Sequence, residues 1–269
     1  MPAADTERPS RQQRLLEQFA DQFRVILVKT VADRERVYSL RHDVFLRELQ
    51  YALPGDSDKQ QEHDDFDEQA IHCLVEHRSS GLAAGCVRLV FPPVDRPDDL
   101  PVMNATRSVF TAPSLHPRQH DGRQIAEISR LAISRLFRAP SKGEETLPVQ
   151  FPPEERQAFP LIVTGLFLSA HALAGLTARR HLYALMEPPL ARLLTLSGFR
   201  FQPVSDTIHY CGTRRAYYID NECAERERNP LLTPLYLRLH ESLGAQLPAT
   251  RDHLDGLGSL WRSTSSCRV

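Results

Sequence analysis

An alternating segment near the middle of the chain, residues Gln124–Arg138, constrains the fold most strongly. Its sequence, QIAEISRLAISRLFR, has mostly apolar side chains on both faces of a period of two, which predicts a β-strand. A strand that is apolar on both faces must be covered on both sides, so we expect it at the centre of a sheet. The run also contains Glu127 and Arg130, and neither charge can be buried without a partner. Glu127 is therefore either half of a buried ion pair or a catalytic base.

Further arginines lie within apolar elements upstream of this strand. The segment Gly85–Val90 reads as a strand and contains Arg88. The segment Ala32–Leu49 has apolar residues at helical spacing, and Arg41 lies on the apolar side of that predicted helix. Each guanidinium must either reach solvent along its apolar stem or find a carboxylate inside the protein.

Acids that could serve these arginines lie in the polar segment Gln50–Gln69. This segment contains the sequence EHDDFD and is long for a loop in a compact domain, and long loops are often functional. Its acids form either a solvated surface or, if Phe66 docks the loop onto the domain, a set of internal partners. In the second case Asp64 and Asp67 would approach the two arginines.

Eight of these residues, taken in chain order, resemble the pattern of the acyl-homoserine lactone (autoinducer) synthases of the GNAT acyltransferase superfamily: Arg41, Phe45, Tyr51, Asp64, Asp67, Arg88, Glu127 and Arg130. The order is even more similar to that of the long-chain N-acyl amino acid synthases, which include the acyltransferase found with PEP-CTERM/exosortase systems. The motifs cover residues 23–138, and element order extends the resemblance to residue 220. Tyr51 stands where the autoinducer synthases usually carry Trp, which argues against the homoserine lactone assignment.

The resemblance implies a GNAT-like α/β (α+β) fold, with a central mixed, mostly antiparallel, twisted sheet and helices on both faces. A predicted hairpin at 70–91 leads into the central strand, and a strand, a helix and two further strands follow it. We expect the chain to have three parts: an N-terminal helical extension at 1–23, an acyltransferase domain at 24–220, and a linker, C-terminal helix and tail at 221–269. A Pro- and Glu-rich surface loop at 139–159 interrupts the acyltransferase domain.

The activity that the resemblance implies is transfer of a long acyl chain from acyl carrier protein to the amine of an amino acid or a similar small amine. Glu127 is the expected base, because burial in an apolar strand favours its neutral form. The implied substrate-binding residues are Arg41, Phe45, Tyr51, Asp64, Asp67, Arg88 and Arg130. The implied residues for pantetheine and its carrier protein are Leu131, Ala132, Ile133, Arg135 and Arg138.

Two features of the central strand refine these expectations. An unbroken strand would place Glu127 and Arg130 on opposite faces, so a bulge must separate them if both line one site. The run that follows, from Arg135 to Gly143, has one glycine and a proline, so it lacks the Gly-rich turn that holds the pyrophosphate of coenzyme A in this superfamily. Arg135 and Arg138 would instead suit an acidic carrier protein, although a solvated basic turn explains them almost as well.

Composition and residue spacing limit the partners and cofactors that the protein could use. The 269 residues carry a net charge of −1, which argues against a nucleic-acid partner, and the histidines and five cysteines lack ligand spacing, so we expect no metal and no cofactor beyond the acyl-carrier co-substrate. We expect no membrane span and a cytoplasmic protein. Two alternatives stay open: an acyl-homoserine lactone synthase that uses S-adenosylmethionine, and a GNAT-like scaffold that binds lipid or carrier protein without turnover.

Overall fold

The computed structural model describes residues 10–55, 58–139 and 149–247. Within these residues, seven strands form one sheet in the order β1-β2-β3-β4-β5-β7-β6, and every neighbouring pair is antiparallel except β4 and β5. The strands are β1 (Phe23–Leu27), β2 (Ala70–His77), β3 (Ala83–Val90), β4 (Ile125–Ile133), β5 (His181–Met186), β6 (Gln202–His209) and β7 (Thr213–Asp220). The predicted central strand is β4, the middle strand of the sheet, and the predicted GNAT-like mixed sheet is confirmed.

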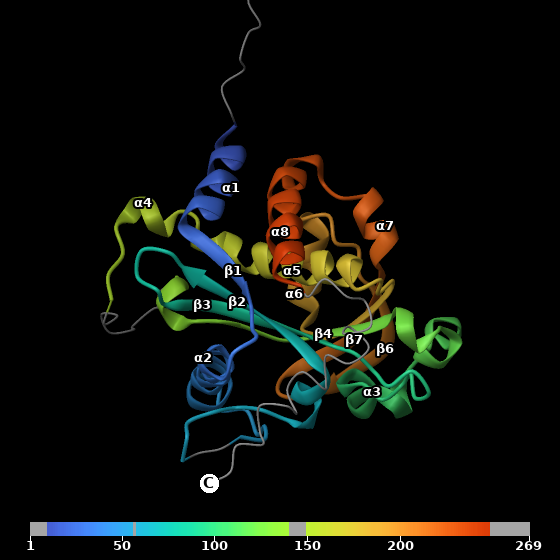
Figure 1. The fold of residues 1–269 in the computed structure, drawn as a ribbon. Helices are drawn as coiled ribbons and strands as arrows, with labels where there is room; N and C mark the ends of the chain where they lie inside the picture. Colours follow the sequence, from blue (N-terminus) through green and yellow to red (C-terminus); the bar gives the residue numbers. More distant parts are fainter. Residues whose placement is uncertain (1–9, 56–57, 140–148, 248–269) are drawn as a thin grey trace, which may run out of the picture.

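Helices cover both faces of the sheet, as expected (Figure 1). One face carries α2 (Val31–Arg41) and the short helix α3 (Pro101–Thr106). The opposite face carries α1 (Arg11–Gln22), α5 (Ile162–Leu176) and α8 (Thr233–Gln246). Three shorter helices complete the described fold: α4 (Pro153–Arg156), α6 (Pro188–Leu196) and α7 (Asn221–Arg226). The helix that we predicted over 32–49 changes form after Arg41, where a π-helix runs from His42 to Glu48.

Helix α5 is buried against the sheet because its sequence is apolar on almost every side. One helical segment among the described residues, Pro153–Leu176, is long and apolar enough to cross a membrane, and 72% of its most apolar stretch is buried inside the protein. Helices α1 and α8 join the same core through side chains such as Phe19 and Leu243. Helices α1 and α8, the described parts of the two terminal segments, therefore pack against the same core as the sheet.

The predicted surface loop at 139–159 is partly wrong. Residues 140–148 lie outside the described part of the chain, but the rest includes α4 and ends in a 3-10 turn. Ala158 and Phe159 are buried in the core, and the Phe159 ring lies 5.0 Å from that of Phe137. The apolar residues between the prolines dock this segment against the end of β4.

Strand β4 contains a bulge near its middle, and there it also separates from its neighbour β5. Cys86 pairs with Ala132 and Arg88 pairs with Ser129, so β4 contains one residue more than β3 between these pairs. Arg130 has a φ of 51°, the left-handed conformation typical of a bulge. The last register pair between β4 and β5 joins Glu127 to Tyr183, and the two strands separate beyond it. A bulge, which we expected if Glu127 and Arg130 line one site, is thus present at Arg130 and Leu131.

Candidate active site

A cleft with a volume of about 320 Å³ opens where β4 and β5 diverge. Its walls come from the π-helix, from β4 between Glu127 and Ile133, from the end of β5, and from the turn between β6 and β7. Because the strands separate, the cleft reaches from one face of the sheet toward the other. Charged and aromatic side chains line its α2 side, and apolar residues line its α5 side: Ile128, Phe167, Ala184, Met186 and Leu190.

Glu127 lies at the inner end of this cleft and is 1% exposed. Its Oε2 accepts a hydrogen bond of 2.7 Å from the backbone N–H of Val102, at the start of α3. Burial raises the pKa of Glu127 to about 8, because this effect outweighs the hydrogen bond and the nearby guanidiniums of Arg88 and Arg130. A carboxyl with a pKa near the working pH, facing a cleft, can exchange protons with a bound molecule.

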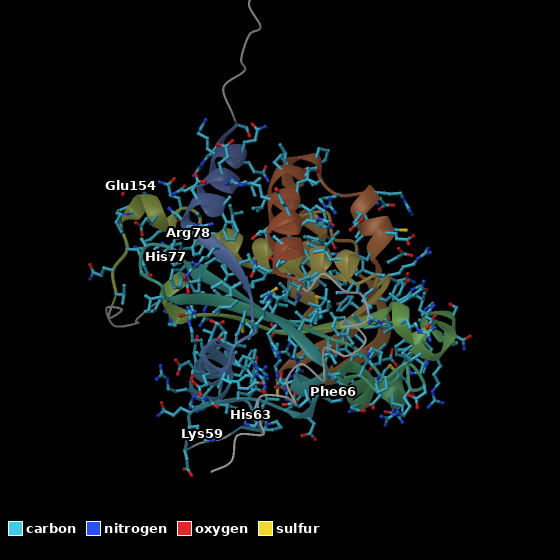
Figure 2. The ribbon with its side chains drawn as sticks, in the orientation of Figure 1. Lys59, His63, Phe66, His77, Arg78 and Glu154 are labelled. Atoms are coloured by element: carbon cyan, nitrogen blue, oxygen red, sulfur yellow. The ribbon has the colours of Figure 1, made fainter. Side chains whose placement is uncertain are left out.

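A largely buried network of three arginines and three carboxylates lies beside Glu127 on the same face of the sheet. Arg41 donates to both oxygens of Asp67, at 2.7 and 3.0 Å. Arg88 also donates to Asp67, at 2.6 Å, and binds Asp64 at 2.5 and 3.2 Å. Asp64 caps a 3-10 turn, Asp65–Gln69, that brings the loop against the sheet. Phe66 packs against the core near α3, and Figure 2 shows it on the α2 side of the sheet.

Glu62 completes this network, although nothing in the sequence distinguishes it from the other acids of the loop. It is fully buried, it accepts a 2.5 Å hydrogen bond from Arg41, and it accepts a 3.0 Å hydrogen bond from Arg130. Arg130 also donates to Asp64 at 2.7 Å. Burial alone would raise the pKa of Asp67, but the guanidiniums of Arg88 and Arg41 outweigh it and hold that pKa well below its usual range. The six charges therefore neutralise one another and fix the loop.

The predicted site residues divide into two groups. Phe45, Tyr51, Arg130 and the β4 residues Leu131–Ile133 line the cleft beside Glu127. Four others form the buried network behind it: Arg41, Asp64, Asp67 and Arg88. These four support the cleft wall through Arg130 instead of facing the cleft.

The two basic residues after β4 have different positions. Arg138 lines the cleft and forms an ion pair with Glu48 at the end of the π-helix. Arg135 donates to the carbonyl oxygen of Ala139 and is not part of the cleft lining. Only Arg138 is thus placed where it can contact a molecule that enters from this end.

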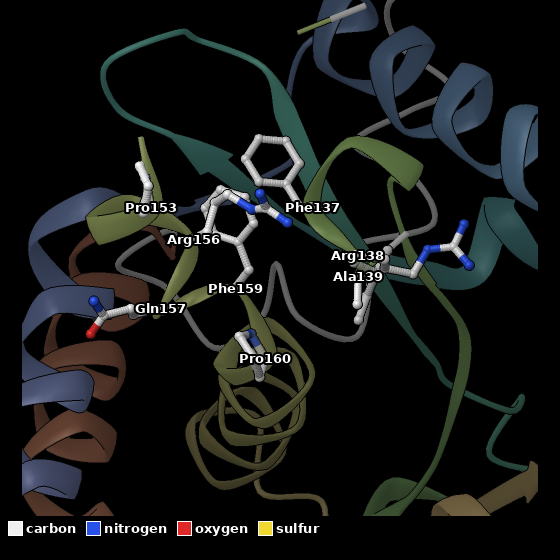
Figure 3. A pocket seen from close by; sticks show the side chains of 9 residues that line it. Phe137, Arg138, Ala139, Pro153, Arg156, Gln157, Phe159 and Pro160 are labelled. Atoms are coloured by element: carbon white, nitrogen blue, oxygen red, sulfur yellow. The ribbon is translucent and has the colours of Figure 1, made fainter. Parts of the chain in front are cut away.

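A second hollow, of about 510 Å³, adjoins the cleft at Ile133 and Arg138 (Figure 3). Phe137 and Phe159 form its apolar floor, and Arg156 projects toward them from α4. The hollow lies past the end of β4, so a long molecule that followed β4 out of the cleft would enter it.

Other functional candidates in the cleft come from distant parts of the sequence. Tyr210 and Cys211 belong to the turn between β6 and β7, Arg214 lies at the start of β7, and Glu187 follows β5. Arg214 Nη2 lies 3.3 Å from the hydroxyl oxygen of Tyr51. The sequence carries no local signal for these residues, because only the parallel β4–β5 pair brings them beside Glu127.

Comparison with known proteins supports this description. Residues 40–144 match the family described as acetyltransferase (GNAT) domain, and no curated protein gives a match to the chain. FeeM, an N-acyl amino acid synthase from uncultured soil microbes, has a similar structure, with a TM-score of 0.54 and 13% identity over 79% of this chain and 98% of FeeM. The AHL synthase LasI has a TM-score of 0.51 and 15% identity, over 74% of this chain and 90% of LasI.

A further similar structure is BjaI, a CoA-dependent acyl-homoserine lactone synthase with SAM and isopentyl-CoA bound. Its TM-score is 0.52 at 18% identity, over 81% of this chain and 89% of BjaI. At these identities the similarity establishes a shared fold. The matched domain and the GNAT-like fold together support an acyltransferase activity.

Proposed function

We propose that the protein is an N-acyltransferase that moves a long acyl chain from acyl carrier protein to the amine of an amino acid or a similar small amine. The observation that carries this proposal is Glu127, a buried carboxyl with a raised pKa at the point where β4 and β5 diverge. Beyond Glu127, the β4 backbone has no β5 partner in register, so the peptide groups on that side of β4, which do not face β3, are available to a donor arm.

The chemistry requires one proton acceptor and one polarising group. The amine nitrogen attacks the thioester carbonyl carbon, so a C–N bond forms and the C–S bond breaks. The amine proton passes to the Glu127 carboxylate, directly or through a water molecule, and then to the departing sulfur, which leaves as a thiol. Backbone N–H groups of β4 near Leu131–Ile133 would stabilise the charge on the carbonyl oxygen.

The two sides of the cleft suit the two halves of this reaction. The apolar side, toward Phe167 and Met186, suits an acyl chain, because burial of each CH₂ group contributes about 0.8 kcal/mol. The polar side, with Tyr51 and Arg130, suits the amine substrate. This division favours the catalytic proposal over a scaffold that binds lipid without turnover.

The donor and the setting are further parts of the proposal. The residues after β4 form a short 3-10 turn, Arg135–Phe137, without the glycines that a pyrophosphate site needs, and this supports a carrier-protein donor. The proposal includes a cytoplasmic location. It also includes an association with PEP-CTERM/exosortase systems, which is supported by the eight residues, from Arg41 to Arg130, whose order in the chain resembles that of the long-chain N-acyl amino acid synthases.

Purified protein tests the proposal directly. Acyl carrier protein and coenzyme A, charged with the same long acyl chain, are each incubated with a panel of amino acids, simple amines and S-adenosylmethionine. Thiol release and mass spectrometry identify the product. An N-acyl amino acid supports the proposal. An acyl-homoserine lactone supports the alternative synthase, and the absence of thiol release with every acceptor supports the scaffold.

A further inference from the structure

Arg214 occupies a fixed position at the polar side of the cleft. It follows a tight turn in which Cys211 and Gly212 have φ values of 49° and 95°. Its Nε donates to the carbonyl oxygens of Tyr210 and Cys211, at 3.0 and 3.1 Å. Its guanidinium also lies over the Tyr51 ring, 5.6 Å from the centroid. These contacts hold the planar group in place before any ligand arrives, which lowers the entropy lost on binding.

The terminal nitrogens of the Arg214 guanidinium have weaker partners than those of the other arginines in the cleft. Among the described residues, the arginines that line it are Arg130, Arg138 and Arg214. Arg130 binds two carboxylates within 3.0 Å, and Arg138 is paired with Glu48. Arg214 Nη2 instead contacts the Tyr51 hydroxyl at 3.3 Å and forms a longer ion pair, of 3.6 Å, with the half-exposed Glu187 carboxylate, beyond the range of a good hydrogen bond. Its side chain is 20% exposed, so it can also donate hydrogen bonds to a carboxylate that enters the cleft.

The register of the sheet relates Arg214 to Glu127. Glu127 pairs with Tyr183 on β5, and the residue after Arg214 pairs with Met186. The backbone positions of Glu127 and Arg214 therefore lie about 13 Å apart along the strands, at roughly 3.3 Å per residue, and roughly 10 Å apart across them, because β5 lies between β4 and β7. By alternation along β7, Arg214 shares the face of Ala216 and Tyr218, which pack in the same cluster as Ile125, on the Glu127 side of β4. Both side chains line the cleft and together cover most of this separation, and a small amino acid would bridge the remainder.

We propose that Arg214 binds the carboxylate of the acyl acceptor and so directs the acceptor's amine toward Glu127. The guanidinium fork can donate two parallel hydrogen bonds to a carboxylate. An amine substrate that lacks a carboxylate cannot form this pair of bonds. This inference rests on the proposed function and narrows its acceptor class to amino acids with a free carboxylate.

Acceptor pairs that differ only in this charge provide the test. Glycine, leucine and tyrosine are compared with their carboxamides, using wild-type protein, Arg214→Gln and Arg214→Lys. We expect Arg214→Gln to raise KM for the amino acids by about 10–100-fold, the value of a charge-assisted hydrogen bond, with a smaller change in kcat. The KM for the amides should change little, and Arg214→Lys should be intermediate because it keeps the charge and loses the fork.

Arg215→Gln is the matched control, because Arg215 is the next residue on β7, does not line the cleft and donates to the carbonyl oxygen of Ser205. Thermal melting of each variant identifies any loss of folding. Equal losses for amino acids and amides, or an unchanged KM in Arg214→Gln, would overturn the inference while leaving the acyl transfer itself established. If the wild-type protein acylates none of these acceptors, the proposed function fails. Calorimetric titration with the same acids and amides then tests Arg214 independently, and equal binding of both by wild-type protein would overturn its role.

Discussion

Glu62 and Arg130 form a 3.0 Å ion pair although 68 residues separate them in the chain. Glu62 comes from the loop before β2, and Arg130 occupies the left-handed position of the β4 bulge. The same carboxylate binds Arg41 at 2.5 Å, so it connects α2, the loop and the bulge. The shape of the cleft wall and the ordering of the loop are therefore linked through one fully buried side chain.

Glu62→Gln should destabilise the protein by about 3–5 kcal/mol, because removing one member of a buried ion pair leaves the charges of its partners uncompensated. Chemical denaturation measures this loss. In a double-mutant cycle, Glu62→Gln and Arg130→Gln should be non-additive, with a coupling energy of about 0.5–3 kcal/mol. Additive losses would show that the two side chains do not interact in solution.

Glu68→Gln is the control for this cycle. Glu68 lies on the same loop, but its side chain is 63% exposed and its ion pair with Arg34 is long, at 3.8 Å. An exposed pair of this kind contributes roughly 0–1 kcal/mol, so the control should remain close to wild type.

Glu127→Gln should lower kcat by about 10²–10⁴, the usual contribution of general base catalysis. The pKa of Glu127 is about 8, so kcat/KM for the wild type should rise with pH through this value as the carboxylate forms. The variant should lose this rise. Acceptors with different amine pKa values separate the enzyme's titration from that of the substrate. A variant with wild-type turnover at saturating substrates would refute the assignment.

The raised pKa of Glu127 also predicts how stability depends on pH. The ordinary value is 4.5 and the folded value is about 8, so between these limits the folded protein holds a proton that the unfolded chain has released. The contribution of this group is complete below pH 4.5 and is lost as pH rises to about 8. Glu127→Gln cannot titrate. The stability difference, wild type minus variant, should therefore fall across this window in urea denaturation and stay constant above it.

Asp67 should show the opposite dependence. Although burial opposes its ionisation, Arg88 and Arg41 hold its pKa below the ordinary 3.8. Its stabilising contribution is therefore present above pH 3.8 and is lost as pH falls toward the lower folded value. Asp67→Asn should be less stable than wild type at neutral pH, and the difference should shrink in acid. A difference that is constant from pH 7 to pH 2 would contradict the ion pairs.

The sequence predicted the parts of this fold that local periodicity encodes. The alternation around Glu127 identified the central strand. The arginines within apolar elements indicated that the acidic loop docks onto the domain, and the contacts of Phe66 with the core confirm this. The spacing of Glu127 and Arg130 also required the bulge that the structure contains. The catalytic and binding roles of these residues stay predictions.

What the sequence did not reveal depends on contacts between distant segments. Glu62 looks like any acid in a charged loop, and its burial follows only when Arg41 and Arg130 meet around it. Arg214 follows an ordinary hairpin turn, and it lines the cleft because β7 pairs with β5 beside the diverging β4. The π-helix after Arg41 also left no signal in the apolar spacing, because a helix with one wider turn keeps nearly the same stripe.

The last prediction concerns the acyl donor. Arg138 lines both the cleft and the adjoining hollow, and it is one third exposed, so a donor entering along β4 would pass it. Acyl carrier proteins are acidic and bring a single phosphate on their pantetheine arm, whereas coenzyme A brings a pyrophosphate for which the turn Arg135–Phe137 offers no glycine-rich site. Charge reversal by Arg138→Glu should therefore raise KM for acyl carrier protein more than it lowers kcat. The same substitution at Arg135, which lies outside the cleft lining, should have a smaller effect.

Matched acyl-carrier-protein and acyl-coenzyme A donors, compared over a salt series, measure this preference. Screening weakens attraction between exposed charges, with a Debye length of about 10 Å at 0.1 M and about 3 Å at 1 M, so turnover with the carrier protein should fall as salt increases. Turnover with coenzyme A should be lower throughout. Arg200→Glu is the control, because Arg200 precedes β6 with a side chain that is 78% exposed and does not line the cleft. Equal use of both donors, or carrier-protein turnover that is insensitive to salt, would show that this surface does not select the donor.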